Sequence, residues 1–242
     1  MPPNIETIKK IGRENIIDIL YKPYTKKMWG VDIEDLDSSI IERIPIRSDL
    51  NEYYFPKDSS QKMPKNGYTN LFENLLDSSV IDVNLMTSFD KKMETEYEHI
   101  FNSMPIDEYY NFSLGELPYR SIKFHTKLIK KEKIYPVAQI NFTDEKKFTR
   151  VVEWKNFPFH GNSNNSLLTY EEPCDYKENN MERYYPVKDS KGFNRDLYRK
   201  YSNIKNEKVT FIGRCGLYVY VDMHQAISSS MSIAKKFLKK ND

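Results

Sequence analysis

Residues 211–227 read FIGRCGLYVYVDMHQAI, and this stretch decides how the C-terminal part of the chain folds. The apolar residues at 209–212 predict a buried strand, and the two glycines that follow predict a tight turn. Asp222 is a favourable N-cap for a helix that we expect to run toward Phe237. Such a joint points backbone N–H groups and a partial positive charge at its turn, where Arg214 adds a donor fork suited to phosphate. Taken alone, these residues are more typical of an ordinary strand-to-helix joint with a surface arginine.

The composition argues against several classes of function. The chain has 37 Lys and Arg against 35 Asp and Glu, so no nucleic-acid-binding or polybasic membrane surface is implied. No apolar run approaches the ~20 residues that span a bilayer, and the first ten residues lack the apolar core of a secretory signal. Two cysteines, Cys174 and Cys215, suggest no disulfide framework and a reducing compartment. We therefore expect a soluble, cytoplasmic protein, and the scattered histidines predict no metal site.

Two further features bear on ligands. The chain has 18 tyrosines, whose flat faces suit a base or a sugar and whose hydroxyls suit a phosphate oxygen, although most tyrosines in any protein are packing residues. It has only eight glycines, and none falls in the G-x-G-x-x-G arrangement that a flavin- or nicotinamide-binding unit normally carries.

The pattern along the chain predicts an α+β fold. Helices are expected over residues 5–21, ended by Pro23, and over 32–44, 70–76 and 194–204. Strands are expected at 80–85, 99–103, Tyr119–Ile129, 137–143, 149–154 and 166–170, and short turn-rich intervals between the last four indicate an antiparallel sheet. Residues 48–66 and 175–190 are typical of loops.

Several blocks of the sequence resemble the UDP-galactopyranose mutase family in order and spacing. In that family a Gly-Arg-x-Gly-x-Tyr-x-Tyr-x-Asp-Met run precedes the last helix, as residues 213–223 do here. Further similar blocks are YKPYTKKMWG (21–30), IIERIPIR (40–47), YYF (53–55), PKNGY (64–68), PID (105–107), GELPYRS (115–121), NFTD (141–144), FTR (148–150) and YYPV (184–187). No single block would suffice, but so many in order make a chance resemblance very improbable.

The resemblance implies an isomerase of galactofuranose biosynthesis. The family interconverts UDP-galactopyranose and UDP-galactofuranose through an adduct between N5 of reduced FAD and the sugar, which is largely a task of positioning. It implies a helical substrate-binding region at 1–77, a remnant of the FAD-binding domain at 78–110, an antiparallel substrate-binding sheet at 111–190 and a flavin-contacting strand, turn and helix at 191–242. The Rossmann-like part would be incomplete.

The resemblance also assigns roles to individual residues, none of them an acid–base catalyst. Tyr24 would stack on the uracil with Trp29 near the sugar, while Arg43 and Arg150 would hold the diphosphate from opposite sides. The remaining substrate-binding positions are Tyr54, Tyr185 and Tyr220 for the phosphates and Arg120 and Glu171 around the sugar; Gly213, Arg214, Tyr220, Asp222 and Met223 would face the flavin. From the residues alone, Trp29 is a half-buried packing residue and Arg43 a helix-end arginine, whereas Arg150 in an apolar strand favours an anion.

The sequence departs from the family in lacking the glycine-rich βαβ unit that grips FAD. Three interpretations stay open: half of a split enzyme, a truncated non-catalytic protein that binds UDP-sugars, or a decayed product whose site residues persist by descent. We expect that the chain alone neither retains FAD nor isomerises its substrate. We also expect that a separate FAD-binding chain or a second copy covers the strands at 80–85 and 209–212.

Overall fold

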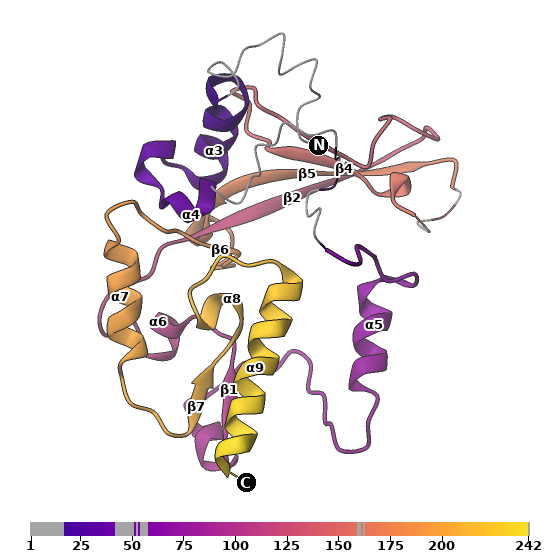
Figure 1. Cartoon of the computed structure of the whole chain (residues 1–242). Coiled ribbons are helices and arrows are strands. Elements are labelled where there is room, and N and C mark those ends of the chain that lie inside the picture. The colour runs from indigo at the N-terminus through magenta and orange to yellow at the C-terminus, as the bar shows by residue number, and fades with distance from the viewer. Residues whose placement is uncertain are drawn as a thin grey trace.

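A five-stranded antiparallel sheet forms the upper half of the molecule in the computed structural model, which describes residues 17–41, 51, 53, 58–158, 161 and 163–241 (Figure 1). The strand order is β3-β4-β5-β2-β6. The strands are β2 (Tyr119–Ile129), β3 (Gln139–Asn141), β4 (Arg150–Glu153), β5 (Ser166–Asp175) and β6 (Tyr185–Pro186). The α+β class and the antiparallel sheet are thus confirmed, and β2 has the predicted bounds. β5 continues five residues beyond its predicted end at 170, because β2 pairs with it as far as Asp175.

Two helices lie against this sheet near β6 (Figure 1). They are α3 (Lys22–Trp29), which follows a π-helical turn at Ile17–Tyr21, and α4 (Ser38–Ile41). The prediction that Pro23 ends the first helix is wrong, because Pro23 lies in the first turn of α3, where its missing N–H removes no helical hydrogen bond. The buried residues shared by these helices and the sheet are Met28, Trp29, Leu36, Ile40 and Ile122.

A second, smaller sheet lies below and consists of β1 (Ile100–Asn102) and β7 (Val209–Phe211), which pair in parallel. The helix α9 (Met223–Asn241) runs alongside it (Figure 1), and the Phe237 ring lies 4.2 Å from the His99 ring and 5.4 Å from the Phe101 ring, centroid to centroid. The predicted strands at 99–103 and 209–212 and the C-terminal helix are therefore confirmed.

The strand predicted at 80–85 is wrong. Residues 77–90 form turns and irregular backbone, and the side chains of Val80 and Leu85 are 89% and 82% exposed. An apolar pattern forms a strand only where a neighbouring strand can take its backbone hydrogen bonds, and β1 and β7 pair with each other.

Further short helices lie along the described part of the chain. They are α5 (Gly67–Leu76), α6 (Ile106–Tyr109), α7 (Phe193–Ser202) and α8 (Gly213–Gly216). In place of one helix over 32–44, the described residues form a 3₁₀ turn at Ile33–Asp35 and then α4. The loop expected at 175–190 contains β6 and a 3₁₀ turn at Tyr176–Glu178.

Gly216, in the turn after β7, lies too close to β1 for any other residue. A β-carbon at this position would lie 2.9 Å from the carbonyl oxygen of Asn102, so the α8 backbone can approach the end of β1 only without a side chain. This glycine therefore serves packing between the strand-to-helix joint and β1.

Tyrosines supply much of the lower core. Tyr119, Tyr176, Tyr201 and Tyr218 are all at most 3% exposed and pack around Ile106 and Leu117. Their hydroxyls have partners: that of Tyr218 donates to the carbonyls of Pro118 (2.9 Å) and Val187 (2.7 Å), and that of Tyr201 to Gly115 (2.7 Å). These tyrosines therefore stabilise the fold, and only part of the tyrosine excess is left for a ligand.

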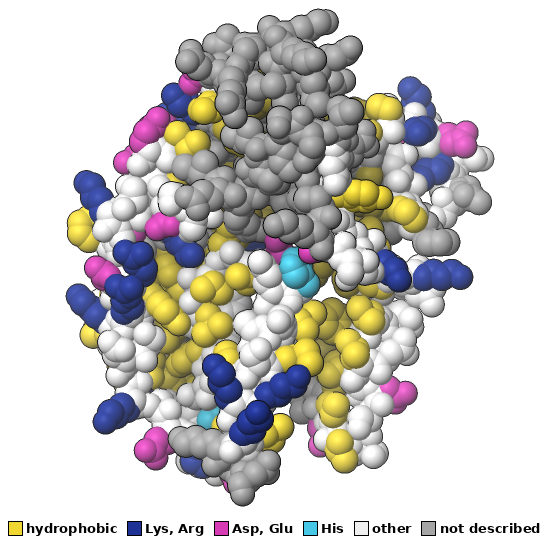
Figure 2. Space-filling model, viewed as in Figure 1, with side chains coloured by type: hydrophobic (Ala, Val, Ile, Leu, Met, Phe, Trp, Pro, Cys, Tyr) yellow, Lys and Arg dark blue, Asp and Glu magenta, His cyan; other side chains and the backbone are white. Residues whose placement is uncertain are grey.

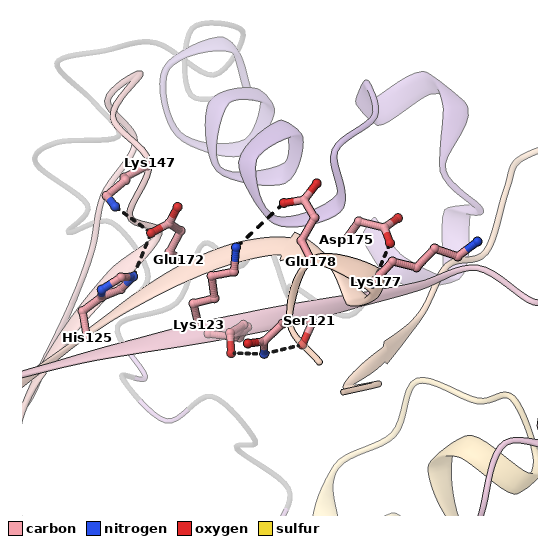
Figure 3. Close-up of polar contacts among 10 residues, drawn as sticks. Ser121, Lys123, His125, Lys147, Glu172, Asp175, Lys177 and Glu178 are labelled. Carbon is pink, nitrogen blue, oxygen red and sulfur yellow. Dashed lines mark hydrogen bonds and ion pairs between the residues drawn. The ribbon is translucent and has the colours of Figure 1, made fainter. Parts of the chain in front are cut away.

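Polar contacts join β2, β5 and the β3–β4 turn across the sheet (Figure 3). One carboxylate oxygen of Glu172 lies 2.8 Å from His125 Nε2 and 2.7 Å from Lys147 Nζ. Within the described ranges, no group of three His, Cys, Asp or Glu side chains is placed to hold a metal ion. None of the helices in the described part of the chain has both the length and the apolar character needed to cross a bilayer.

Candidate functional site

Three aromatic side chains from distant parts of the sequence meet between α3, β6 and the segment before α9. The ring of Trp29 lies 6.1 Å from that of Tyr185 and 5.3 Å from that of Tyr220, and the two tyrosine rings are 5.4 Å apart. The interplanar angles of 66°, 86° and 79° are those of edge-to-face packing. Trp29 is 6% exposed, so it is a packing residue as well as a wall of the site.

The Tyr185 hydroxyl stays protonated at neutral pH. Burial, and then the proximity of Tyr220, raise the pKa of Tyr185 to about 12. A protonated phenol can donate a hydrogen bond to an anion, so this side chain suits a phosphate oxygen.

Arg150 extends from β4 into the same region. It stands directly opposite Glu171 of β5, and its Nε lies 2.6 Å from Glu171 Oε2, while Nη1 donates to Gln139 at 3.3 Å. Burial works against its charge, but Tyr24, Glu171, Tyr185 and Tyr220 together raise the pKa of the guanidinium above its ordinary value. Arg150 therefore contacts Glu171 of β5 and interacts electrostatically with predicted site residues from α3, β6 and the segment before α9.

Glu171 is the acidic member of this group. Its side chain is almost entirely buried, and burial raises the pKa of this carboxyl even though Arg150 works in the opposite direction. Burial thus disfavours the charged form of this carboxyl, and the ion pair with Arg150 offsets part of that cost.

Arg214 is a second cation beside the aromatic group. Its guanidinium carbon lies 5.3 Å from the Tyr185 ring centroid and 5.4 Å from that of Tyr220. Nη1 donates to the Tyr184 carbonyl at 3.0 Å and Nη2 to the Val221 carbonyl. Arg214 therefore fixes the turn between α8 and α9 to the strand that carries Tyr185.

The other predicted flavin-facing residues surround the start of α9. Gly213 begins α8 with a left-handed backbone (φ +72°), which favours glycine. The Asp222 N–H donates to the Gln225 side chain at 2.9 Å, which is one half of a capping box and supports the predicted helix start. Met223 is 59% exposed at the first turn.

Three predicted site residues are not placed beside the aromatic group by the structure. Arg43 and Tyr54 lie outside the described residues. Arg120 directs two of its nitrogens at the end of α3, at 3.0 Å from the Met28 carbonyl and 3.4 Å from the Lys27 carbonyl.

One contact of this region was not predicted from the sequence. Lys27 donates to the Phe148 carbonyl at 2.8 Å and forms an ion pair with Asp144 at 3.3 Å. Lys27 lies three residues after Tyr24 in the YKPYTKKMWG block, so the sequence indicates that both residues belong to α3. No sequence pattern indicates its distant partners.

The fold and this region define an α+β protein with a cationic and aromatic site between a helical segment and a curled antiparallel sheet. A family model described as UDP-galactopyranose mutase matches residues 19–220. The chain therefore belongs to the UDP-galactopyranose mutase family.

Curated relatives agree with this assignment. The chain is 32% identical to a UDP-galactopyranose mutase of Mycoplasma pneumoniae, over 91% of this chain and 59% of that protein. It is 32% identical to a probable UDP-galactopyranose mutase of Klebsiella pneumoniae, over 96% and 60%, and 30% identical to a dTDP-fucopyranose mutase of Escherichia coli, over 98% and 64%. The chain thus spans about three fifths of the length of these relatives.

Proposed function

We propose that the chain binds a nucleoside-diphosphate sugar, UDP-galactose, and forms the substrate-binding part of a UDP-galactopyranose mutase. The observation that carries this proposal is the packing of Trp29, Tyr185 and Tyr220 against one another. Arg150 extends toward this aromatic group and interacts electrostatically with Tyr24, Tyr185 and Tyr220. A largely buried guanidinium among aromatic faces and phenol hydroxyls suits a diphosphate joined to a planar base.

Each residue of this group has a physical role in the proposal. Arg150 gives charge-assisted hydrogen bonds to the diphosphate and stabilises the negative charge that UDP gains when it leaves the sugar. Tyr185 and Tyr220 donate to phosphate oxygens, and Tyr24 stacks on the uracil. Trp29, held by both tyrosines, forms the wall beside the sugar.

The residues present fit the ring end of FAD and not its pyrophosphate. Arg214 joins the tyrosine group to the start of α9, and the exposed Met223 lies there too, so this surface can meet a flat, electron-rich ring. The 242 residues hold no G-x-G-x-x-G loop for a dinucleotide pyrophosphate. Reduced FAD, when bound, would supply the nucleophile that displaces UDP from the sugar. Glycine, arginine and capping residues at 213–223 would hold and orient that ring.

A second candidate is binding of UDP-sugars without turnover. It shares the nucleotide site, so the two candidates differ only in catalysis. One relative is a dTDP-fucopyranose mutase. Comparing the affinities of the chain for dTDP and for UDP therefore tests which base the site prefers.

The isolated chain is expected to purify without flavin. The pyrophosphate would lack the backbone donors and helix N-terminus that ordinarily neutralise it. Absorbance between 350 and 500 nm (roughly the flavin range, set by the cofactor itself) checks retention, and incubation with UDP-galactose and dithionite-reduced FAD checks turnover. Co-purified flavin, or conversion of UDP-galactopyranose by the chain alone, would refute the expectation.

The lower layer suggests where additional polypeptide belongs. β1 and β7 form a parallel pair in the described part of the chain, and parallel strands normally lie within larger sheets covered by helices. Figure 2 shows hydrophobic side chains exposed on both sides of α9. Exposed apolar residues of α5 and α9 include Phe72, Leu75, Ile227, Met231 and Leu238.

We infer that this surface receives a βα-containing segment corresponding to the relatives' remaining two fifths, joined to this chain or supplied separately. It would add strands to β1–β7 and cover the apolar face of α9. A second copy of the chain is the alternative occupant.

A protein made from the 242 residues alone is expected to bind a hydrophobic dye such as ANS and to self-associate. Fluorescence titration and size-exclusion chromatography with light scattering measure both. A monodisperse monomer that leaves the dye unbound would contradict the inference and favour a free-standing binding module.

A further inference from the structure

The C-terminal end of α3 rests on the guanidinium of Arg120. Arg120 Nε donates to the Met28 carbonyl at 3.0 Å, and Nη2 donates to the Lys27 carbonyl at 3.4 Å. These carbonyls belong to the last turn of the helix, where no later helical N–H donates to them. A cation also suits the partial negative charge at a helix C-terminus. Arg120 therefore joins β2 to the end of α3.

Gly30 completes this contact. It has a left-handed backbone (φ +73°), and its N–H donates to the Lys26 carbonyl at 2.8 Å, so it terminates α3. A β-carbon on Gly30 would lie 3.1 Å from Arg120 Nη1 and 3.2 Å from Cζ. The chain can thus turn closely over the guanidinium only with glycine here.

A second cation, Lys27, also joins α3 to the sheet. Lys27 Nζ donates to the Phe148 carbonyl at 2.8 Å, in the β3–β4 turn two residues before Arg150. Arg120 and Lys27 therefore fix α3 against β2 and against the strand that carries Arg150. Trp29, the buried last residue of α3, lies in the helical turn that these contacts hold.

We infer that Arg120 is a positioning residue, which holds α3 so that Trp29 packs against Tyr185 and Tyr220, and that it does not bind the sugar. This inference rests on the proposed function for its effect on ligand affinity, although the effect on α3 is independent of it. It replaces the sugar-contacting role that the family resemblance implied for Arg120.

Tryptophan fluorescence separates the two roles. The chain has two tryptophans, so a Trp154→Phe background leaves Trp29 as the reporter. In this background Arg120→Met is expected to shift the Trp29 emission to longer wavelength and to increase its quenching by acrylamide, without any ligand. Affinities for UDP and UDP-galactose should fall by the same factor, about tenfold, because two hydrogen bonds that position the site are lost. Arg120→Lys should restore part of the Trp29 emission and part of the ligand affinity.

Matched variants complete the test. Gly30→Ala pushes against the same guanidinium and should shift Trp29 emission in the same direction, whereas Arg199→Met, on an exposed face of α7 beside Asp196, should change nothing. If Arg120→Met does not fold by circular dichroism, Arg120→Lys and Gly30→Ala carry the test. Unchanged Trp29 emission with a loss of affinity for UDP-galactose alone would overturn the inference. If the parent protein binds no UDP, the proposed function fails, and Trp29 emission still decides the role of Arg120.

Discussion

Replacing Arg150 with alanine is expected to lower the affinity for UDP roughly 100-fold, the loss of about 2.7 kcal/mol. The guanidinium is largely buried, and hydrogen bonds between charged groups are the strongest that a diphosphate can gain there. Arg150→Lys keeps the charge without the planar fork and should lie between the two. Isothermal titration calorimetry at neutral pH measures the series. Affinity of Arg150→Ala within threefold of the parent would contradict the proposed role.

The same substitution leaves Glu171 buried without its ion-pair partner, and this loss needs its own control. An unpaired buried carboxylate destabilises a fold, so Arg150→Ala should also unfold at lower temperature. Adding Glu171→Gln removes the uncompensated charge and should recover stability. The double variant should still fail to bind UDP, which separates loss of the ligand contact from loss of the fold.

Replacing Glu153 with alanine is expected to reduce the free energy of unfolding by about 3–5 kcal/mol, because a fully buried acceptor disappears. Its carboxylate accepts hydrogen bonds from the backbone N–H groups of Ile134 and Tyr135, from Ser166 and from Asn156, at 2.7–3.1 Å. It thus ties the 132–137 loop to β4 and β5. The melting temperature should fall by roughly 10 °C, measured by circular dichroism. A shift below about 2 °C would show that water replaces the carboxylate.

The pH dependence of this stabilisation has a defined sign. Burial alone would raise the pKa of Glu153, but the hydrogen bonds from Ser166, Tyr135, Ile134 and Asn156 hold the pKa below its ordinary value of 4.5. A folded-state pKa below the unfolded one contributes stability above the ordinary value, and this is lost as pH falls through the folded pKa. Glu153→Gln, which cannot ionise, should therefore lie closer to the parent in melting temperature at acidic pH than at pH 7.

The sequence patterns predicted those elements whose signals are local. The alternation in β2 and the turn residues around it define Tyr119–Ile129, whereas β5 continues beyond its predicted end at 170 and passes through Pro173 to Asp175. Pro173 is tolerated because it lies beyond the last β4–β5 pair, Arg150–Glu171. Residues 80–85 have the apolar pattern of a strand without a strand to pair with, which no local pattern reveals.

The candidate site depended on the resemblance, since its members come from positions 24 to 220 and no periodicity relates them. What the resemblance could not supply is the geometry within the group. Arg120 was expected around the sugar, yet its nitrogens lie on the α3 carbonyls, and helix-end carbonyls carry no sequence signal of their own. Lys27 was part of a quoted block without a role, because its partners are more than a hundred residues away.

Calorimetric titration of the unmodified chain tests whether it binds UDP through the diphosphate. Uridine, which has the same base and no diphosphate, is the matched ligand. We expect one UDP per chain and an affinity for uridine at least about 100-fold weaker, because Arg150 and the tyrosine hydroxyls bind the phosphates. Equal affinities for the two ligands, or no binding of UDP by a chain that circular dichroism shows to be folded, would contradict it.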